Sequence, residues 1–94
     1  MQNAIPTHVI EMGNQLEHVA YELACAMLSL DHHPSIWNTV SRRAEKGAAR
    51  AILERANGNI SLSALALGVN RNTLATRVTE FGIDIAAVRK GGDA

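Results

Sequence analysis

Aromatic side chains, cysteine and proline are all scarce in this chain of 94 residues. The aromatic residues are Trp37, Tyr21 and Phe81, whereas Ala, Leu, Val and Ile are plentiful, so we expect an aliphatic core. The single cysteine, Cys25, excludes a disulfide within the chain and suits a reducing compartment. A chain of this length is enough for one domain, and small domains that bury little surface are commonly stabilised by oligomerisation.

Long apolar runs are also absent. No stretch approaches the roughly 18 residues of a membrane span. The first residues lack a basic segment followed by an apolar one, which a secretory signal would need. We therefore expect a cytoplasmic protein with no membrane partner.

Positive charge is missing from one half of the chain. Residues 1–41 hold four acidic residues and no Lys or Arg, whereas residues 42–94 hold nine Lys and Arg against five Asp and Glu. The two halves therefore carry net charges of −4 and +4, although the whole chain is neutral. Such asymmetry indicates an end that binds a polyanion, joined to an end with another function.

No alternating strand pattern occurs, and apolar residues recur at helical spacing almost throughout. The spacing predicts an all-α fold with four main helices, over residues 7–30, 34–56, 61–67 and 71–81. Asn57-Gly58, Gly68 and Gly82 are expected to end three of them, and Ser61 and Asn70 to cap the last two at their starts. Asp84 is expected to cap one or two further turns, and residues 91–94 to form a flexible tail.

The first helix carries an apolar stripe that is expected to be buried. Its members lie three and four residues apart, and Ala20, Ala24 and Cys25 widen it; they are Met12, Leu16, Val19, Leu23, Met27 and Leu30. Because four short helices alone leave a poor core, this stripe favours a two-fold dimer, with Cys25 as a packed thiol.

The last two main helices form a candidate helix-turn-helix. The third is expected to bury Leu62, Leu65 and Ala66, and Leu67-Gly68-Val69-Asn70 to make the turn. On the fourth, Leu74, Val78 and Phe81 fall on one side. Asn72, Thr76 and Thr79 fall on the other, which is therefore small, polar and uncharged. Arg71 and Arg77 flank the buried stripe, where long side chains can reach two phosphate backbones.

Residues 49–84 resemble the C-terminal helix-turn-helix of the Fis family, which includes a small nucleoid protein and the DNA-binding ends of sigma-54-dependent activators. The matching pieces are Gly58-Asn59, Ala64, Leu67-Gly68, Val69-Asn70-Arg71, Thr73-Leu74 and Phe81-Gly82. The resemblance implies a dimer built from the N-terminal helices and a cytoplasmic protein associated with the nucleoid.

The resemblance also implies which residues contact DNA. The positions of Asn59 and Ser61 hold phosphates in the family, and those of Asn70, Arg71 and Thr73 anchor the recognition helix. With Asn72, Thr76 and Arg77 from the helix faces, the predicted DNA-binding set is Asn59, Ser61, Asn70, Arg71, Asn72, Thr73, Thr76 and Arg77. The positions of Ala75, Thr76 and Arg77 are basic in the nucleoid protein, and only Arg77 is basic here. This departure favours a more selective, weaker or partner-assisted binder over a protein that coats DNA.

Other readings of these residues stay open. Arg42, Arg43, Lys46 and Arg50 form either a solvated helix face or a set of DNA backbone contacts. The four histidines and Cys25 lack the spacing that preorganises a metal site, so no metal is predicted. No nucleophile has a base at a meaningful spacing and no phosphate loop occurs, so we predict no enzyme activity and no cofactor.

Together these features predict a sequence-selective regulator of bacterial or phage origin that binds double-stranded DNA as a homodimer. Residues 1–57 are the expected dimerisation helices, residues 58–84 the DNA-binding region, and residues 85–94 a short extension and tail. The alternative is a protein-interaction module with the same dimer fold, whose acidic N-terminal half would bind a protein partner.

Overall fold

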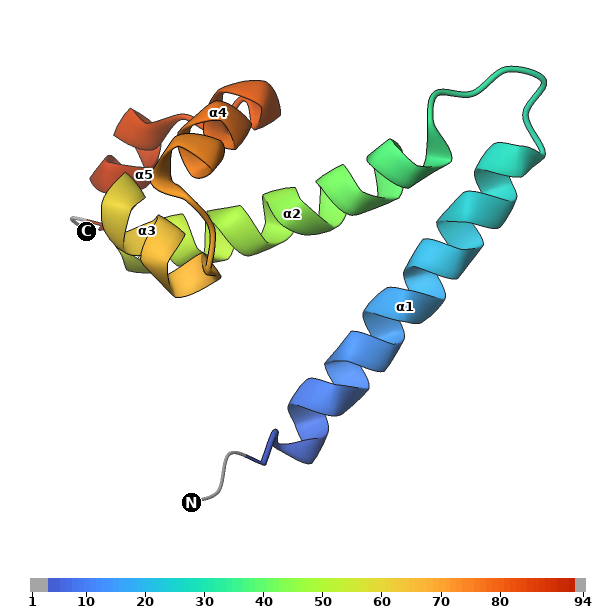
Figure 1. The fold of residues 1–94 in the computed structure, drawn as a ribbon, viewed down its shortest axis with the longest axis horizontal. Coiled ribbons are helices and arrows are strands. Elements are labelled where there is room, and N and C mark those ends of the chain that lie inside the picture. Colours follow the sequence, from blue (N-terminus) through green and yellow to red (C-terminus); the bar gives the residue numbers. More distant parts are fainter. Residues whose placement is uncertain (1–3, 93–94) are drawn as a thin grey trace. The chain divides into compact units, whose positions relative to one another are not determined.

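The computed structural model describes the backbone of residues 4–92 and the side chains of residues 4–89. Five helices follow one another in the order α1 (Thr7–Leu28), α2 (Ile36–Arg55), α3 (Ile60–Leu67), α4 (Arg71–Phe81) and α5 (Ile85–Gly92) (Figure 1). No strand occurs within residues 4–92, so the prediction of an all-α fold is confirmed. Over the same residues, no helix has both the length and the apolar character to cross a membrane.

The chain divides into two compact units, one ending at Ser41 and the other beginning at Arg42. The division falls inside α2, so this helix contributes to both units. The sequence placed its functional boundary later, after residue 57, and that assignment of roles stays a prediction.

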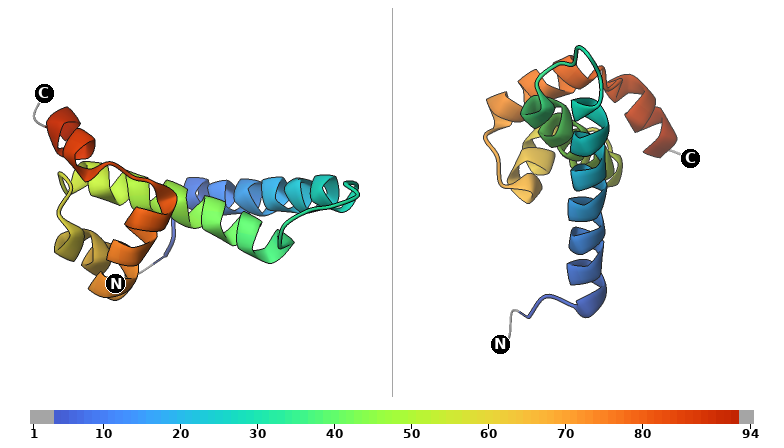
Figure 2. Two further views of the ribbon diagram at one scale, coloured as in Figure 1. Left: turned by 90° about the horizontal axis from the view of Figure 1, so that it is seen from above. Right: turned by 90° about the vertical axis from the view of Figure 1, so that its right-hand side faces the viewer.

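The core of the second unit is aliphatic, as expected. Leu53 of α2 is fully buried and lies in one cluster with Ala49, Ala64, Leu74 and Val78. Ile60, Leu67, Ile83, Ile85 and Val88 pack around this cluster. In Figures 1 and 2, α3, α4 and α5 gather around the C-terminal half of α2. Helices α3 and α4 therefore pack on the C-terminal half of α2.

Left-handed residues end the helices where the sequence predicted. Asn57 and Gly58 follow α2 with φ of 55° and 79°. Gly68 ends α3 and Gly82 ends α4, both with positive φ and with backbone N–H groups that donate to the last turns. These stops fix the lengths of the two short helices.

One of the two predicted N-caps is confirmed and the other is wrong. Asn70 caps α4, because its Oδ1 accepts a hydrogen bond of 2.7 Å from the backbone N–H of Asn72. The cap of α3 is Asn59 rather than Ser61, since Asn59 Oδ1 accepts from the N–H of Leu62 at 3.0 Å. The helix begins one residue earlier than predicted because Asn59 directly follows the left-handed turn.

The predicted burial of α3 is also wrong. Leu62 and Leu65 are 56% and 79% exposed, and Ala66 is exposed too. The face turned to the core carries Ile60, Ser63, Ala64 and Leu67 instead, a stripe at helical spacing that includes a polar residue. The sequence prediction relied on hydrophobicity and therefore assigned the wrong side of α3 to the core.

The apolar stripe of α1 is largely exposed in a single copy of the chain. Met12, Leu16 and Val19 are each more than half exposed, and Met27 is the one residue of α1 that is buried. Cys25 is exposed as well, so the expected packed thiol is not found. The chain by itself therefore leaves this stripe in contact with solvent.

The C-terminal extension forms a helix of eight residues, which matches the longer of the two predicted lengths. Asp84 caps it as expected, since its Oδ1 accepts a 3.2 Å hydrogen bond from the N–H of Ala87. Gly91 and Gly92 belong to α5 rather than to a tail. Residues 93–94, the rest of the predicted tail, lie outside the described residues.

Candidate nucleic-acid interface

Helices α3 and α4 pack on each other and are joined by residues 68–70, which is the arrangement of a helix-turn-helix. Leu74 and Val78 of α4 are buried in the core of the unit. The opposite side of α4 is therefore exposed at the surface of the unit. This side is available to contact a partner.

The exposed side of α4 holds three of the predicted DNA-binding residues. Asn72, Thr73 and Thr76 are all exposed, and Thr79 follows them on the same side. Ala75 is half-buried, so a side chain there has less room than the sequence suggested. The exposed surface of α4 is thus polar and uncharged until Glu80, near its end.

Three other predicted residues meet in a polar hollow of about 390 Å³ beside the start of α4. Asn59, Ser61 and Arg71 line it, and Arg71 Nε donates a 3.0 Å hydrogen bond to Ser61 Oγ. Arg89 of α5 also lines the hollow, and sequence reasoning missed it. No local signal in the sequence placed it there, because Arg89 reaches the hollow through the packing of α5 on the core. We refer to this cavity as the polar hollow.

Two predicted residues remain: Asn70 caps α4, and Arg77 lies in an ion-pair network between α2 and α4. Its Nε donates to Glu45 Oε1 at 3.0 Å, and its Nη1 donates to Glu80 Oε1 at 3.3 Å. Arg42 Nη1 also donates to Glu80. The Arg77 side chain is 30% exposed. The positive charges of Arg42 and Arg77 are balanced by the negative charges of Glu45 and Glu80. This flank of α4 therefore attracts phosphate less strongly than two unpaired arginines would.

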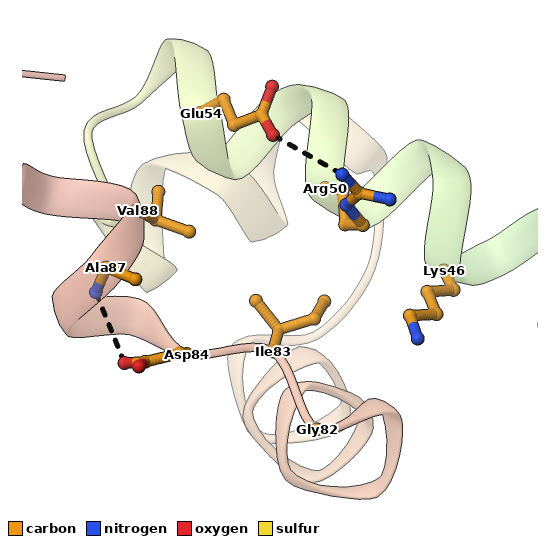
Figure 3. A pocket seen from close by; sticks show the side chains of 8 residues that line it. All are labelled: Lys46, Arg50, Glu54, Gly82, Ile83, Asp84, Ala87 and Val88. Atoms are coloured by element: carbon orange, nitrogen blue, oxygen red, sulfur yellow. Dashed lines mark hydrogen bonds and ion pairs between the residues drawn. The ribbon is translucent and has the colours of Figure 1, made fainter. Parts of the chain in front are cut away.

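A larger hollow of about 610 Å³ lies between α2 and the segment that leads into α5 (Figure 3). Lys46 and Arg50 line it together with Glu54 and Asp84, so both signs of charge are present. Arg50 Nη2 lies 4.0 Å from Glu54 Oε2, while Asp84 is engaged as the cap of α5. This balance of charge favours neither an anionic nor a cationic ligand.

The histidines do not assemble a site in the part of the chain that the structure describes. His18 Nε2 lies 3.2 Å from Glu22 Oε2 one turn further along α1, and both side chains are largely exposed. Among residues 4–89, no three His, Cys, Asp or Glu side chains gather closely enough to hold a metal ion.

Comparison with known protein families gives a match, over residues 41–81, to the family described as bacterial regulatory protein, Fis family. The match begins at the boundary between the two units and covers the rest of α2, α3 and α4, but not α5. Comparisons with curated proteins and with solved structures give no match. The matched family is one of regulators rather than enzymes. Residues 41–81 therefore match the Fis family of bacterial regulatory proteins, and this match supports a DNA-binding helix-turn-helix regulator in general.

Proposed function

We propose that this protein is a sequence-selective DNA-binding homodimer, a Fis-like transcriptional or nucleoid regulator of bacterial or phage origin. The observation that carries the proposal is the exposed side of α4, where Asn72, Thr73 and Thr76 serve no purpose in the core. Asn pairs with adenine in the major groove, and the Thr methyl group meets the thymine methyl group. A surface of this kind reads bases without strong electrostatic attraction.

The residues around the start of α4 would fix the helix in the groove. Arg71 is oriented by Ser61, and one N–H of its guanidinium is used in that bond. Four N–H groups of Arg71 remain for guanine or for a phosphate. Asn70 would act through its cap, which sets the direction of the first turn of α4. Asn59 and Ser61 would hold the neighbouring phosphate.

Selective binding, rather than coating of DNA, is favoured by the charges on α4. Thr76 and the half-buried Ala75 add no positive charge, and Arg77 is paired with Glu45 and Glu80. Fewer phosphate contacts mean a smaller sequence-independent contribution to affinity. Discrimination then depends more on the base contacts.

A dimer is supported by the exposed apolar stripe of α1. Met12, Leu16 and Val19 would leave solvent if the same stripe of a second copy covered them. A two-fold dimer would place two α4 helices in successive major grooves, and its site would be a palindrome with half-sites about 34–36 Å apart. The acidic residues of the first 41 would then face away from DNA or toward a protein partner.

The test is a selection of random double-stranded DNA by the full chain, followed by binding measurements on the enriched site. We expect an enriched palindrome, and Arg71→Ala should weaken binding to it by about 1–3 kcal/mol if Arg71 pairs with guanine. Arg55→Ala, an exposed arginine of α2 that does not line the polar hollow, is the control. If no sequence is enriched and no DNA binds even at low salt, the protein-interaction module is the better reading.

A further inference from the structure

Helix α5, which lies beyond the family match, contributes Arg89 to the lining of the polar hollow. We propose that α5 supplies Arg89 as an additional contact to the DNA backbone, so that the hollow holds one phosphate between Arg89, Ser61 and Arg71. The inference rests on the proposed function, because it assigns a further residue to the same interface. The match to the Fis family ends at residue 81, four residues before α5 begins.

Helix α5 is anchored firmly enough to hold a side chain in place. Ile85 and Val88 pack against the core cluster, and the Asp84 cap fixes the first turn. Arg89 follows Val88 directly and lies one turn after Ile85. Its backbone is therefore positioned by the same core that supports α3 and α4.

Because Gly58 has no side chain, it leaves space for the side chain of Arg89. A Cβ atom at Gly58 would lie 2.8 Å from Arg89 Cγ, 3.1 Å from Arg89 Nε and 3.2 Å from Ile85 Cγ2. The stem of Arg89 thus lies directly over the turn between α2 and α3, in space that any other residue at position 58 would fill. Gly58 also has φ of 79°, so this position favours glycine for two reasons.

The groups around the hollow are suited to an anion. No acidic side chain lines it, and neither Arg71 nor Arg89 forms an ion pair among residues 4–89. Ser61 Oγ accepts from Arg71, so its own hydroxyl proton is left to donate. Asn59 Oδ1 is used by the cap, which leaves its Nδ2 as a donor. Two guanidinium groups with neutral donors between them match the oxygens of a phosphate.

The source of this phosphate is DNA rather than a small molecule, because the hollow adjoins the first turn of α4. Arg71, which lines the hollow, is also the first residue of that helix. A duplex contacted by Asn72 and Thr73 would bring its backbone past Arg71. Arg89 would then extend the contact along one strand.

The test compares Arg89→Gln with the parent in binding to the selected site and to an unrelated duplex, over a range of salt concentrations. Gln keeps part of the stem over Gly58 and removes the charge. The slope of log K against log salt is negative, and we expect it to become shallower by about 0.9 for each bound chain. Affinity for both duplexes should fall by the same factor, because a phosphate contact carries no sequence information.

Two further variants make the result specific. Arg55→Gln removes the same charge from an exposed arginine of α2 that does not line the hollow and should leave the slope unchanged, while Arg89→Lys should retain most of it. A folded Arg89→Gln protein with the slope of the parent would overturn the inference, and so would an equal loss in Arg55→Gln. In both cases the parent still binds DNA and the proposed function stands. If the parent binds no duplex, the proposed function fails and the inference fails with it.

Discussion

At the residue scale, Asn59 has two tasks in the proposed interface. Its Oδ1 accepts from Leu62 N and satisfies one backbone donor at the start of α3. Its Nδ2 is left for a phosphate in the hollow. The sequence could not separate Asn59 from Ser61 as the cap, because both residue types cap helices well and only two positions separate them. The left-handed pair Asn57-Gly58 decides the matter by ending just before Asn59.

The cap assignment gives a stability prediction. Asn59→Ala should lower the free energy of unfolding by about 1 kcal/mol, because the N–H of Leu62 loses its partner. Ser61→Ala is the matched control and should cost less, since Ser61 bonds to an exposed arginine side chain and not to the helix backbone. Urea denaturation of both variants measures the difference. A larger loss for Ser61→Ala than for Asn59→Ala would indicate that Ser61 caps α3, as the sequence predicted.

Ser63 is the buried polar residue of α3 that hydrophobicity did not identify. It is fully buried, and its Oγ has no hydrogen-bond partner among the described residues. Ser63→Ala should therefore raise the free energy of unfolding by about 1 kcal/mol, since an unsatisfied hydroxyl is removed and Ala favours helix. Ser63→Thr adds a methyl group to the same filled space and should destabilise the protein. Thermal unfolding checks both, and a loss of stability in Ser63→Ala would show that the hydroxyl has a partner.

At the element scale, α4 is held to α2 by charge as well as by its apolar side. Arg77 contacts Glu45 and Glu80, and Arg42 contacts Glu80 from α2. The sequence assigned Arg77 to the DNA backbone because Glu45 lies 32 residues away and its approach depends on the packing of α2 against α4. The backbone contact of Arg77 stays a prediction, and it would require the network to open.

Glu80→Gln tests what the network contributes. The change removes the carboxylate shared by Arg42 and Arg77, and we expect a loss of about 0.5–1 kcal/mol because both pairs are partly exposed. The loss should shrink in high salt, which screens such pairs. Glu54→Gln, in an exposed pair of 4.0 Å, should have almost no effect. Equal losses for the two variants, at low and high salt alike, would mean that the network does not bind α4 to α2.

At the scale of the whole molecule, the sequence predicted the second unit better than the first. Glycines, asparagines and helical spacing are local signals, and they gave the all-α class, the ends of α4 and the exposed side of that helix. The polar hollow was only partly predicted, because Arg89 reaches it through the packing of α5. The sequence predicted that the apolar stripe of α1 is buried, but in the single chain this stripe is largely exposed. An apolar stripe indicates a surface that is covered, and it does not indicate which molecule covers it.

Leu16 tests whether a second copy covers that stripe. Leu16 is more than half exposed in the single chain, so Leu16→Asp would change the stability of a monomer little. In a dimer whose core includes Leu16, the same change buries a charge and should produce monomers or unfolded chains. Asn14→Asp adds the same charge on the opposite side of α1 and should leave the dimer intact. Sedimentation equilibrium gives the mass of each variant, and the melting temperature of the parent should rise with concentration if folding and association are linked. A parent that sediments as a monomer, or a Leu16→Asp variant that remains a folded dimer, would move the interface away from this stripe.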